Sequence, residues 1–190
     1  GADISCVTSD RVEDTRILIR YFSQCGKNRI ALVGFRKDSF HDMERYYAAI
    51  NSSVTLKASI TDNDVFFTDD SLEDCFSVFL PLAKDYDAII CPNDATALCF
   101  IKYCRSNGIG IPEDLYVASF ANMKIGQYST PSLTSVAIDY ESIGIQAFNI
   151  WDFICKNLPR NLVCKMDVPS KLMIRQSTNY APYDQQSEYE

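Results

Sequence analysis

Four polar side chains in this sequence have the types and places that a carbohydrate-binding cleft needs. They supply a guanidinium, an amide, a carboxylate and an aromatic ring, in the order Arg45, Asn93, Asp94 and Tyr140. Sugars present rows of neighbouring hydroxyl groups and apolar ring faces, which such groups hydrogen-bond and stack on. Each residue also has an ordinary alternative, because an arginine on a helix is most often solvated and Asn-Asp before a helix is most often a cap.

Catalytic chemistry is less well supported by the residue types. The one histidine, His41, lies in a polar stretch after an expected strand, where a surface helix start fits better than the base of a Ser-His nucleophile. Paired carboxylates for glycoside hydrolysis are an alternative, although sequence fixes no distance between them. Their candidates are Asp10, Glu13, Asp69, Asp70 and Asp94. We expect no catalytic residue and a protein that is not an enzyme.

The acidic loop from Asp62 to Glu73 resembles an EF-hand calcium loop in its spacing. However, Phe66 and Phe67 stand where that loop requires an oxygen ligand and a turn-forming glycine. An acidic connection between a strand and a helix is therefore the better interpretation. We expect no metal and no cofactor.

Composition limits the classes of protein that remain. The 190 residues are 47% hydrophobic and 23% charged, which is typical of a globular protein. A formal charge of −7 argues that this chain does not grip a phosphate backbone unaided. The eight cysteines form no C-x-x-C pair and most lie in apolar runs, so we expect reduced, buried thiols and a cytoplasmic protein. No run approaches the roughly 20 apolar residues of a membrane span.

Short apolar runs alternate with segments of helical period, which predicts an α/β fold with doubly wound parallel sheets. The expected strands are Ile4–Val7, Ile30–Gly34, Leu56–Ile60, Ala88–Cys91, Tyr116–Phe120 and Thr134–Ile138. Apolar stripes between them predict helices, with Ser71 and Asn93 as N-caps. The stripe Met43, Tyr47 and Ile50 marks one helix. The residues Ala147, Ile150, Trp151, Ile154 and Leu158 mark the inward face of the last helix, and extended segments follow at 162–168 and 172–174.

In such folds ligands bind outside the carboxyl ends of the strands. The residues just after the expected strands are rich in polar groups, and they include Asp10 with Glu13, Asn93 with Asp94, and Ala121 with Asn122. The topology would therefore gather them at one edge of the sheet. From about residue 179 to residue 190 the chain is polar and tyrosine-rich, which indicates a loosely held tail.

Several segments, in order, resemble the LacI/GalR family of sugar-responsive transcription regulators. The resemblance spans about Ile4 to Thr178. Its main motifs are Gly26-Lys-Asn-Arg-Ile-Ala-Leu-Val-Gly34, Arg45 to Ala48, Asp87-Ala-Ile-Ile-Cys-Pro-Asn-Asp-Ala-Thr-Ala97, Gly108-Ile-Gly-Ile-Pro-Glu-Asp-Leu-Tyr-Val-Ala-Ser-Phe120, Pro131 to Val136, and Arg175-Gln-Ser-Thr178. Six motifs in register make a chance match improbable.

The resemblance implies a periplasmic-binding-protein-like fold, with a small-molecule effector held between two subdomains of a homodimer. It implies that residues 1–26 and 135–158 form part of the N-terminal subdomain, and that 27–134 and 159–178 form the C-terminal one. Operator DNA would be bound through a helix-turn-helix head that this chain lacks. The effector contacts implied by position are Asp10 or Glu13, Arg45, Asp70, Asn93, Asp94 and Tyr140.

Two positions depart from the family pattern. Ala121 stands where the family carries an aspartate that often binds a hydroxyl, and Asp70 stands where an aromatic platform is common. The expected ligand is therefore a small polar molecule, with a sugar as the first candidate.

Other activities on this fold remain alternatives. A solute receptor of a membrane importer would carry a signal peptide upstream, whereas a regulator would carry a helix-turn-helix of about 60 residues. An enzyme acting on a sugar or nucleotide is the third alternative. Segments Ile4–Cys25 and Thr134–Leu158 represent little of the N-terminal subdomain, so we expect them to bury their apolar stripes against a second copy.

Overall fold

A computed structural model describes residues 4–69, 71–157 and 163–178 of the chain. Six strands form the main sheet in the order β3-β2-β4-β5-β6-β8, parallel except for β8. Their bounds are β2 Ile30–Phe35, β3 Val65–Phe67, β4 Ala88–Ile90, β5 Tyr116–Phe120, β6 Thr134–Ala137 and β8 Lys171–Met173. A second sheet of two parallel strands joins β1 (Cys6–Ser9) to β7 (Lys165–Val168).

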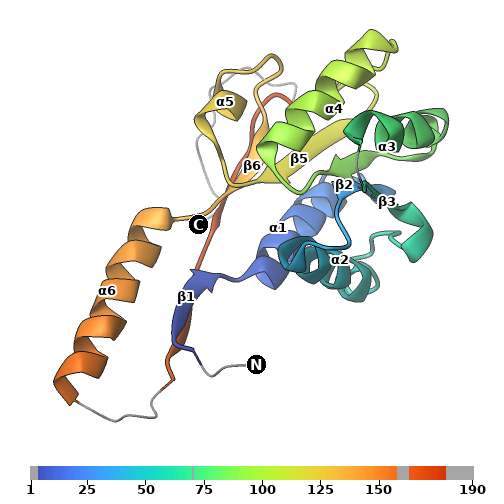
Figure 1. Ribbon diagram of the computed structural model, residues 1–190. Coiled ribbons are helices and arrows are strands. Elements are labelled where there is room, and N and C mark those ends of the chain that lie inside the picture. Colours follow the sequence, from blue (N-terminus) through green and yellow to red (C-terminus); the bar gives the residue numbers. More distant parts are fainter. Residues whose placement is uncertain (1–3, 70, 158–162, 179–190) are drawn as a thin grey trace.

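Helices cover both faces of the main sheet (Figure 1). These helices are α1 Arg11–Gln24, α2 Phe40–Ser53, α3 Leu72–Phe79 and α4 Asp94–Ser106. Side chains alternate along β2, so that Ala31 and Val33 meet the core under α3 and α4, whereas Ile30 and Leu32 meet the core under α1 and α2. Because both faces are buried, the strands read as continuous apolar runs. The expected doubly wound α/β fold is confirmed.

The two-stranded sheet and the last helix stand apart from this body. We call β1, β7 and α6 (Tyr140–Asn157) the arm, which extends from the six-stranded sheet in Figure 1. Helix α6 contacts β1. We expected the segment of helix α1 to belong to the N-terminal subdomain. Instead, α1 packs Leu18 and Phe22 into the core beneath the six-stranded sheet. Short elements complete the chain, namely α5 Lys124–Gln127 and the 3-10 turns Asp62–Asp64 and Leu80–Asp85.

One expected strand is wrong, and one expected helix face is only partly correct. Residues 56–60 form a turn with a single bridge from Ser59 to Arg29, and the third strand of the sheet is instead Val65–Phe67. In α2 the buried face carries Arg45, Ala48 and Ala49, whereas Tyr47 is 57% exposed. Helix α2 packs mainly against α1, and of the expected stripe Ile50 packs against the core.

The expected inward face of α6 is only partly correct, because Ile150 and Ile154 are half-buried whereas Ala147 and Trp151 are exposed. No described residue of α6 is buried, and Trp151 is 59% exposed. Leu158 lies outside the described residues, as does the expected tail at 179–190. All eight cysteines are described and free, but Cys6, Cys25, Cys99 and Cys155 are exposed rather than buried. Among the described residues, no helix is long and apolar enough to cross a bilayer.

Candidate ligand-binding site

The carboxyl ends of β2, β4 and β5 lie side by side in the six-stranded sheet. Their register aligns Leu32 with Ile90 and Ile90 with Ala118. The loops that follow these strands therefore meet at one edge, as expected for the ligand-binding edge of an open α/β sheet. Asn93 lies near this edge because it follows β4. Arg45 lies near it as well, because its side chain hydrogen-bonds to Pro92, the residue before Asn93.

Arg45 is the expected site residue that keeps an unused hydrogen-bond donor in a buried position. Its Nη1 donates a hydrogen bond to the Pro92 carbonyl oxygen at 3.0 Å, and its guanidinium carbon lies 4.1 Å from the centre of the Phe120 ring. The residue is only 8% exposed, and its Nε has no hydrogen-bond partner. Burial lowers the pKa of Arg45, whereas Asp42 and Asp14 raise it. A buried guanidinium with a spare donor is costly unless something pairs with it.

Asp42 fixes the loop between β2 and α2. Its Oδ2 accepts the backbone N–H of Arg36 at 3.0 Å, and Ser39 caps the helix by accepting the backbone N–H of Asp42. Arg45 Nη1 lies 4.0 Å from Asp42 Oδ1. The loop is therefore tied to α2 and places Arg45 at a fixed position.

Asp94 is a buried structural carboxylate at the start of α4. Its oxygens accept hydrogen bonds from the hydroxyls of Ser119 and Ser135 and from the backbone N–H of Met123, with the Ser135 bond at 2.7 Å. The residue has no exposed surface. Three donors satisfy its charge, and it ties β5, β6 and the loop before α5 to the positive end of the α4 dipole.

Asn93 is exposed and caps α4. Its Oδ1 accepts the backbone N–H of Thr96 at 2.9 Å. It is next to Pro92, whose carbonyl holds Arg45. Asn93 and Arg45 are thus brought together.

Asp10 and Glu13 take local roles on α1. Asp10 is the N-cap, and its Oδ1 accepts the backbone N–H groups of Val12 and Glu13 at 3.0 Å each. Glu13 forms an ion pair with Arg20 at 3.2 Å. Glu13 therefore points along the exposed face of the helix, and only Asp10 lies beside the buried polar cluster described next.

Sequence reasoning missed Asp14. This aspartate is 1% exposed, and its Oδ2 has no hydrogen-bond partner. Burial raises the pKa of Asp14, while the hydroxyls of Ser170 and Ser9 and the charge of Arg45 lower it. The sequence did hold a signal, since Asp14 precedes Leu18 by one helical turn on the buried stripe of α1. A carboxylate on an apolar stripe marks a buried polar contact.

Tyr140 begins α6 and is 63% exposed. It lies close enough to Arg45 to raise the pKa of that guanidinium. The structure brings Arg45 and Asn93 together, whereas Tyr140 stands at the start of the arm. Asp70 lies outside the described residues.

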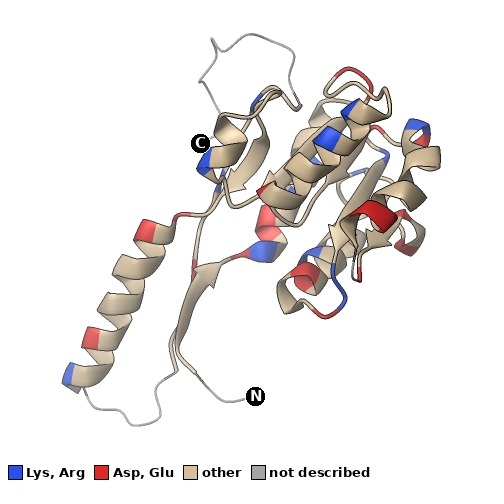
Figure 2. Cartoon of the chain, turned by 45° about the horizontal axis from the view of Figure 1, so that its top comes forward, with Lys and Arg blue, Asp and Glu red and all other residues tan. Residues whose placement is uncertain are grey.

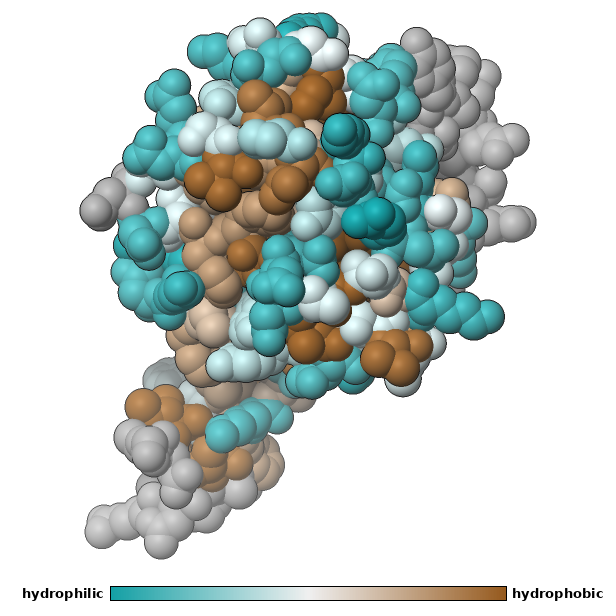
Figure 3. Space-filling model, turned by 90° about the vertical axis from the view of Figure 1, so that its right-hand side faces the viewer, coloured by the Kyte–Doolittle hydropathy of each residue, from teal (hydrophilic) through white to brown (hydrophobic). Residues whose placement is uncertain are grey.

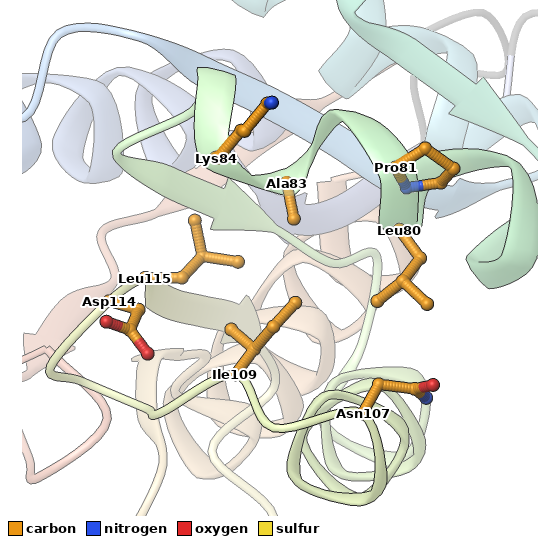
Figure 4. Close-up of a pocket in the computed structure, with 8 residues that line it drawn as sticks. All are labelled: Leu80, Pro81, Ala83, Lys84, Asn107, Ile109, Asp114 and Leu115. Atoms are coloured by element: carbon orange, nitrogen blue, oxygen red, sulfur yellow. The ribbon is translucent and has the colours of Figure 1, made fainter.

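Two of the hollows on the described part of the surface are lined by residues other than Arg45, Asn93 and Tyr140. One of about 510 Å³ lies beside the edge strand β3 and includes Lys37, Thr68 and Asp69. The other, of about 520 Å³, lies near the amino ends of β4 and β5 (Figure 4). Its lining residues are Leu80, Pro81, Ala83, Lys84, Asn107, Ile109, Asp114 and Leu115. Within the described residues no group of His, Cys, Asp and Glu side chains is arranged to hold a metal.

Comparisons with known proteins identify the family to which this fold belongs. A model of the periplasmic binding protein-like domain matches residues 19–178. The chain belongs to this family. A relative from Bacillus subtilis (strain 168), the NTD biosynthesis operon regulator NtdR, is 38% identical over 114 residues, which cover 57% of this chain and 34% of the relative. The HTH-type transcriptional repressor PurR of Vibrio atlanticus (strain LGP32) is 27% identical over 139 residues, covering 69% of this chain and 40% of the relative.

Solved structures show the same fold. The structure described as a transcriptional regulator CelR-cellobiose complex superimposes with a TM-score of 0.80 at 22% identity, over 92% of this chain and 54% of that one. The resemblance to LacI/GalR regulators expected from the sequence motifs is therefore confirmed, as is the periplasmic-binding-protein-like fold. This family member spans less than half the length of the two curated relatives.

Proposed function

We propose that this chain is the effector-sensing part of a bacterial transcription regulator, most simply a repressor, that binds a small polar ligand. A sugar is the first candidate for that ligand. The observation that carries the proposal is Arg45, whose buried guanidinium keeps an unpartnered Nε at the carboxyl edge of the six-stranded sheet. Relatives named as regulators support the regulatory role, and the cellobiose complex of a protein with this fold supports the ligand class.

We assign a role to each candidate residue from the hydrogen-bonding groups that the protein leaves unused. Arg45 would donate to ligand hydroxyls, Asn93 would offer its amide, and the exposed ring of Tyr140 would stack on an apolar face. We infer that Asp94 acts by holding the loop that carries Asn93, because its charge is already satisfied. Contacts from Asp10, Glu13 and Asp70 stay predictions.

The ligand cleft is proposed to lie between the body and the arm. Three connections join these parts, at Asp10 between β1 and α1, at residues 138–139 between β6 and α6, and at residues 169–170 between β7 and β8. We propose that the subdomain boundaries lie at these connections. Helix α1 then belongs to the C-terminal subdomain, together with the six-stranded sheet. A bound ligand would close the cleft by rotating the arm toward the body about these connections.

Operator DNA is proposed to be contacted outside this chain. A formal charge of −7 disfavours binding to the phosphate backbone, and the Vibrio relative is named as a helix-turn-helix type repressor. We further propose a cytoplasmic protein that works as a homodimer and has no enzymatic activity. The regulator names of the relatives support this assignment over a catalytic one.

Thermal denaturation with monosaccharides, disaccharides, sugar phosphates and nucleosides tests the proposal. A ligand at 100 times its dissociation constant adds about 2.7 kcal/mol to stability. This raises the Tm by about 5 to 11 °C for a chain of this size. Arg45→Lys should abolish the shift, whereas Arg105→Ala, on the exposed last turn of α4, should retain it.

Two results would refute the assignment. A hit whose shift survives Arg45→Lys would show that the ligand binds elsewhere. A hit that is chemically converted during incubation, as followed by chromatography, would favour an enzyme over a sensor.

A further inference from the structure

The buried guanidinium of Arg45 is surrounded by more negative than positive charge. Asp42 Oδ1 lies 4.0 Å from its Nη1. Asp14 is close enough for the two charges to shift each other's pKa, lowering that of Asp14 and raising that of Arg45. The neighbouring cation, Arg11, already forms an ion pair with Glu44, at 3.1 Å. Two guanidinium groups are therefore set among three carboxylates.

Asp14 is the carboxylate of this group that the protein leaves with unused capacity. It is 1% exposed, and its Oδ2 has no hydrogen-bond partner. Asp42, by contrast, accepts a backbone N–H through its Oδ2. The side chains beside Asp14 other than Arg45 include Ser9 and Ser170, whose hydroxyls carry no charge. The charge of Asp14 therefore acts mainly against that of Arg45 and reduces the attraction of the guanidinium for an anion.

The loop between β2 and α2 carries two further cations, and each is already engaged. Arg36 forms an ion pair with Asp38, with 2.7 Å between Nη2 and Oδ2. Lys37 places its Nζ 5.0 Å from the centre of the Phe67 ring, beside edge strand β3. This loop therefore adds no net positive charge beside Arg45.

The arm does not supply positive charge to the proposed cleft either. The chain enters α6 through Asp139 and Glu141, and Lys171 lies close enough to Asp139 to lower its pKa. The other charged side chains of α6, Asp152 and Lys156, form an ion pair of 2.7 Å farther along the helix (Figure 2). In Figure 3 apolar side chains colour the arm below the body. The cleft is thus acidic or uncharged on both of its sides, apart from Arg45.

We propose, resting on the function proposed above, that the effector of this chain is an uncharged sugar or polyol and that Asp14 sets this preference through Arg45. A ligand hydroxyl can accept a hydrogen bond from Arg45 and also donate one, so it tolerates the neighbouring carboxylates. A carboxylate or phosphate on the ligand would pair with Arg45, but it would be repelled by Asp14 and Asp42. At the effective dielectric of a partly buried site, such repulsion weakens binding roughly tenfold.

Pairs of compounds that share a carbon skeleton test the charge of the effector on the unmodified chain. Thermal denaturation at equal ionic strength compares glucose with glucuronate, galactose with galacturonate, and ribose with ribose 5-phosphate. We expect the uncharged member of at least one pair to raise the Tm and its acidic partner to have little effect. A larger shift from the acidic partner would overturn this preference while leaving the proposed function standing. No shift from any compound would count against the proposed function, and the preference would fall with it.

Isothermal titration calorimetry on the responding pair tests the role of Asp14. Asp14→Asn removes the charge with little change of shape, and the ratio of the two dissociation constants should fall about tenfold in favour of the acidic compound. Asp14→Glu retains the charge and should keep the original ratio. Glu13→Gln is the matched control, because it removes one negative charge from the exposed face of α1, where Glu13 pairs with Arg20.

The ratio separates an electrostatic role from a structural one. A residue that only supports the fold would weaken both compounds together when substituted, and the ratio would stay constant. An unchanged ratio in Asp14→Asn would overturn the role of Asp14, as would an equal change in Glu13→Gln. If Asp14→Asn does not fold, the ratio in Asp14→Glu and the pairs on the unmodified chain still decide, since an acidic compound preferred by either protein contradicts the proposal.

Discussion

Gly34→Ala tests how the end of β2 is fitted to the start of α4. Gly34 has a φ of +83°, and the register of β2 on β3 shifts between Val33 and Phe35. A Cβ at Gly34 would lie 2.6 Å from Cγ2 of Thr96, on the first turn of α4. The left-handed backbone costs about 1 to 2 kcal/mol for alanine. The overlap with Thr96 costs about 1 to 3 kcal/mol more. We therefore expect a loss of about 2 to 5 kcal/mol.

A double-mutant cycle separates the two contributions. Thr96→Ser removes the methyl group that an alanine at position 34 would meet, while the Asn93 cap on the backbone N–H of residue 96 remains. In that background Gly34→Ala should cost only the backbone part, about 1 to 2 kcal/mol. Urea denaturation followed by far-UV circular dichroism measures all four variants. An equal cost in both backgrounds would refute the steric argument and assign the whole effect to the backbone.

Three further predictions concern buried groups. Asp94→Asn should lower the free energy of unfolding by about 3 kcal/mol in urea denaturation. The new amide N–H₂ would face the N–H of Met123 or a serine hydroxyl and leave a buried donor unpaired. A loss below about 1 kcal/mol would contradict this. Burial raises the pKa of Asp14 above its ordinary value of 3.8. Between the unfolded and the native pKa, the native state therefore keeps a proton that the unfolded chain has lost. The free energy of unfolding falls as the pH rises through this interval. Asp14→Asn should flatten that part of a stability–pH profile, and an unchanged slope would count against the assignment. Phe79→Ala should lose about 3 to 5 kcal/mol by thermal denaturation, because its ring is fully buried 5.4 Å from that of Phe100; a loss near that of a surface substitution would show that the core refills the space.

The strands at the centre of the sheet could be predicted because both of their faces are buried. Ile30–Phe35 is an uninterrupted apolar run and Tyr116–Phe120 is broken only by Ser119. Such runs indicate burial without any knowledge of the partner strand. Edge strand β3 could not be predicted in this way. Its three residues are only partly buried and are flanked by acidic residues, so the segment Val65–Phe67 fitted an acidic loop equally well.

Helix faces were harder to predict than helix positions. The caps Ser71 and Asn93 were predicted correctly, because capping depends on local hydrogen bonds within three residues. The buried face of α2 was predicted only in part, since it includes Arg45, which is buried against Pro92 and Phe120 from distant parts of the chain. Periodicity identifies an apolar stripe but carries no information on which surface will cover it.

The same dependence on tertiary partners decides which polar residues are available to a ligand. The sequence named Asp94 and Arg45 alike as candidate ligand contacts, the first directly after an expected strand and the second on a helix. The structure separates them by their hydrogen bonds, since three protein donors satisfy Asp94 whereas Arg45 retains a buried, unpartnered Nε. A ligand gains more from pairing with the second group than from competing for the first, because an unpaired buried donor carries a cost that binding removes. Substitution of Arg45 should therefore affect ligand response, and substitution of Asp94 should affect stability first.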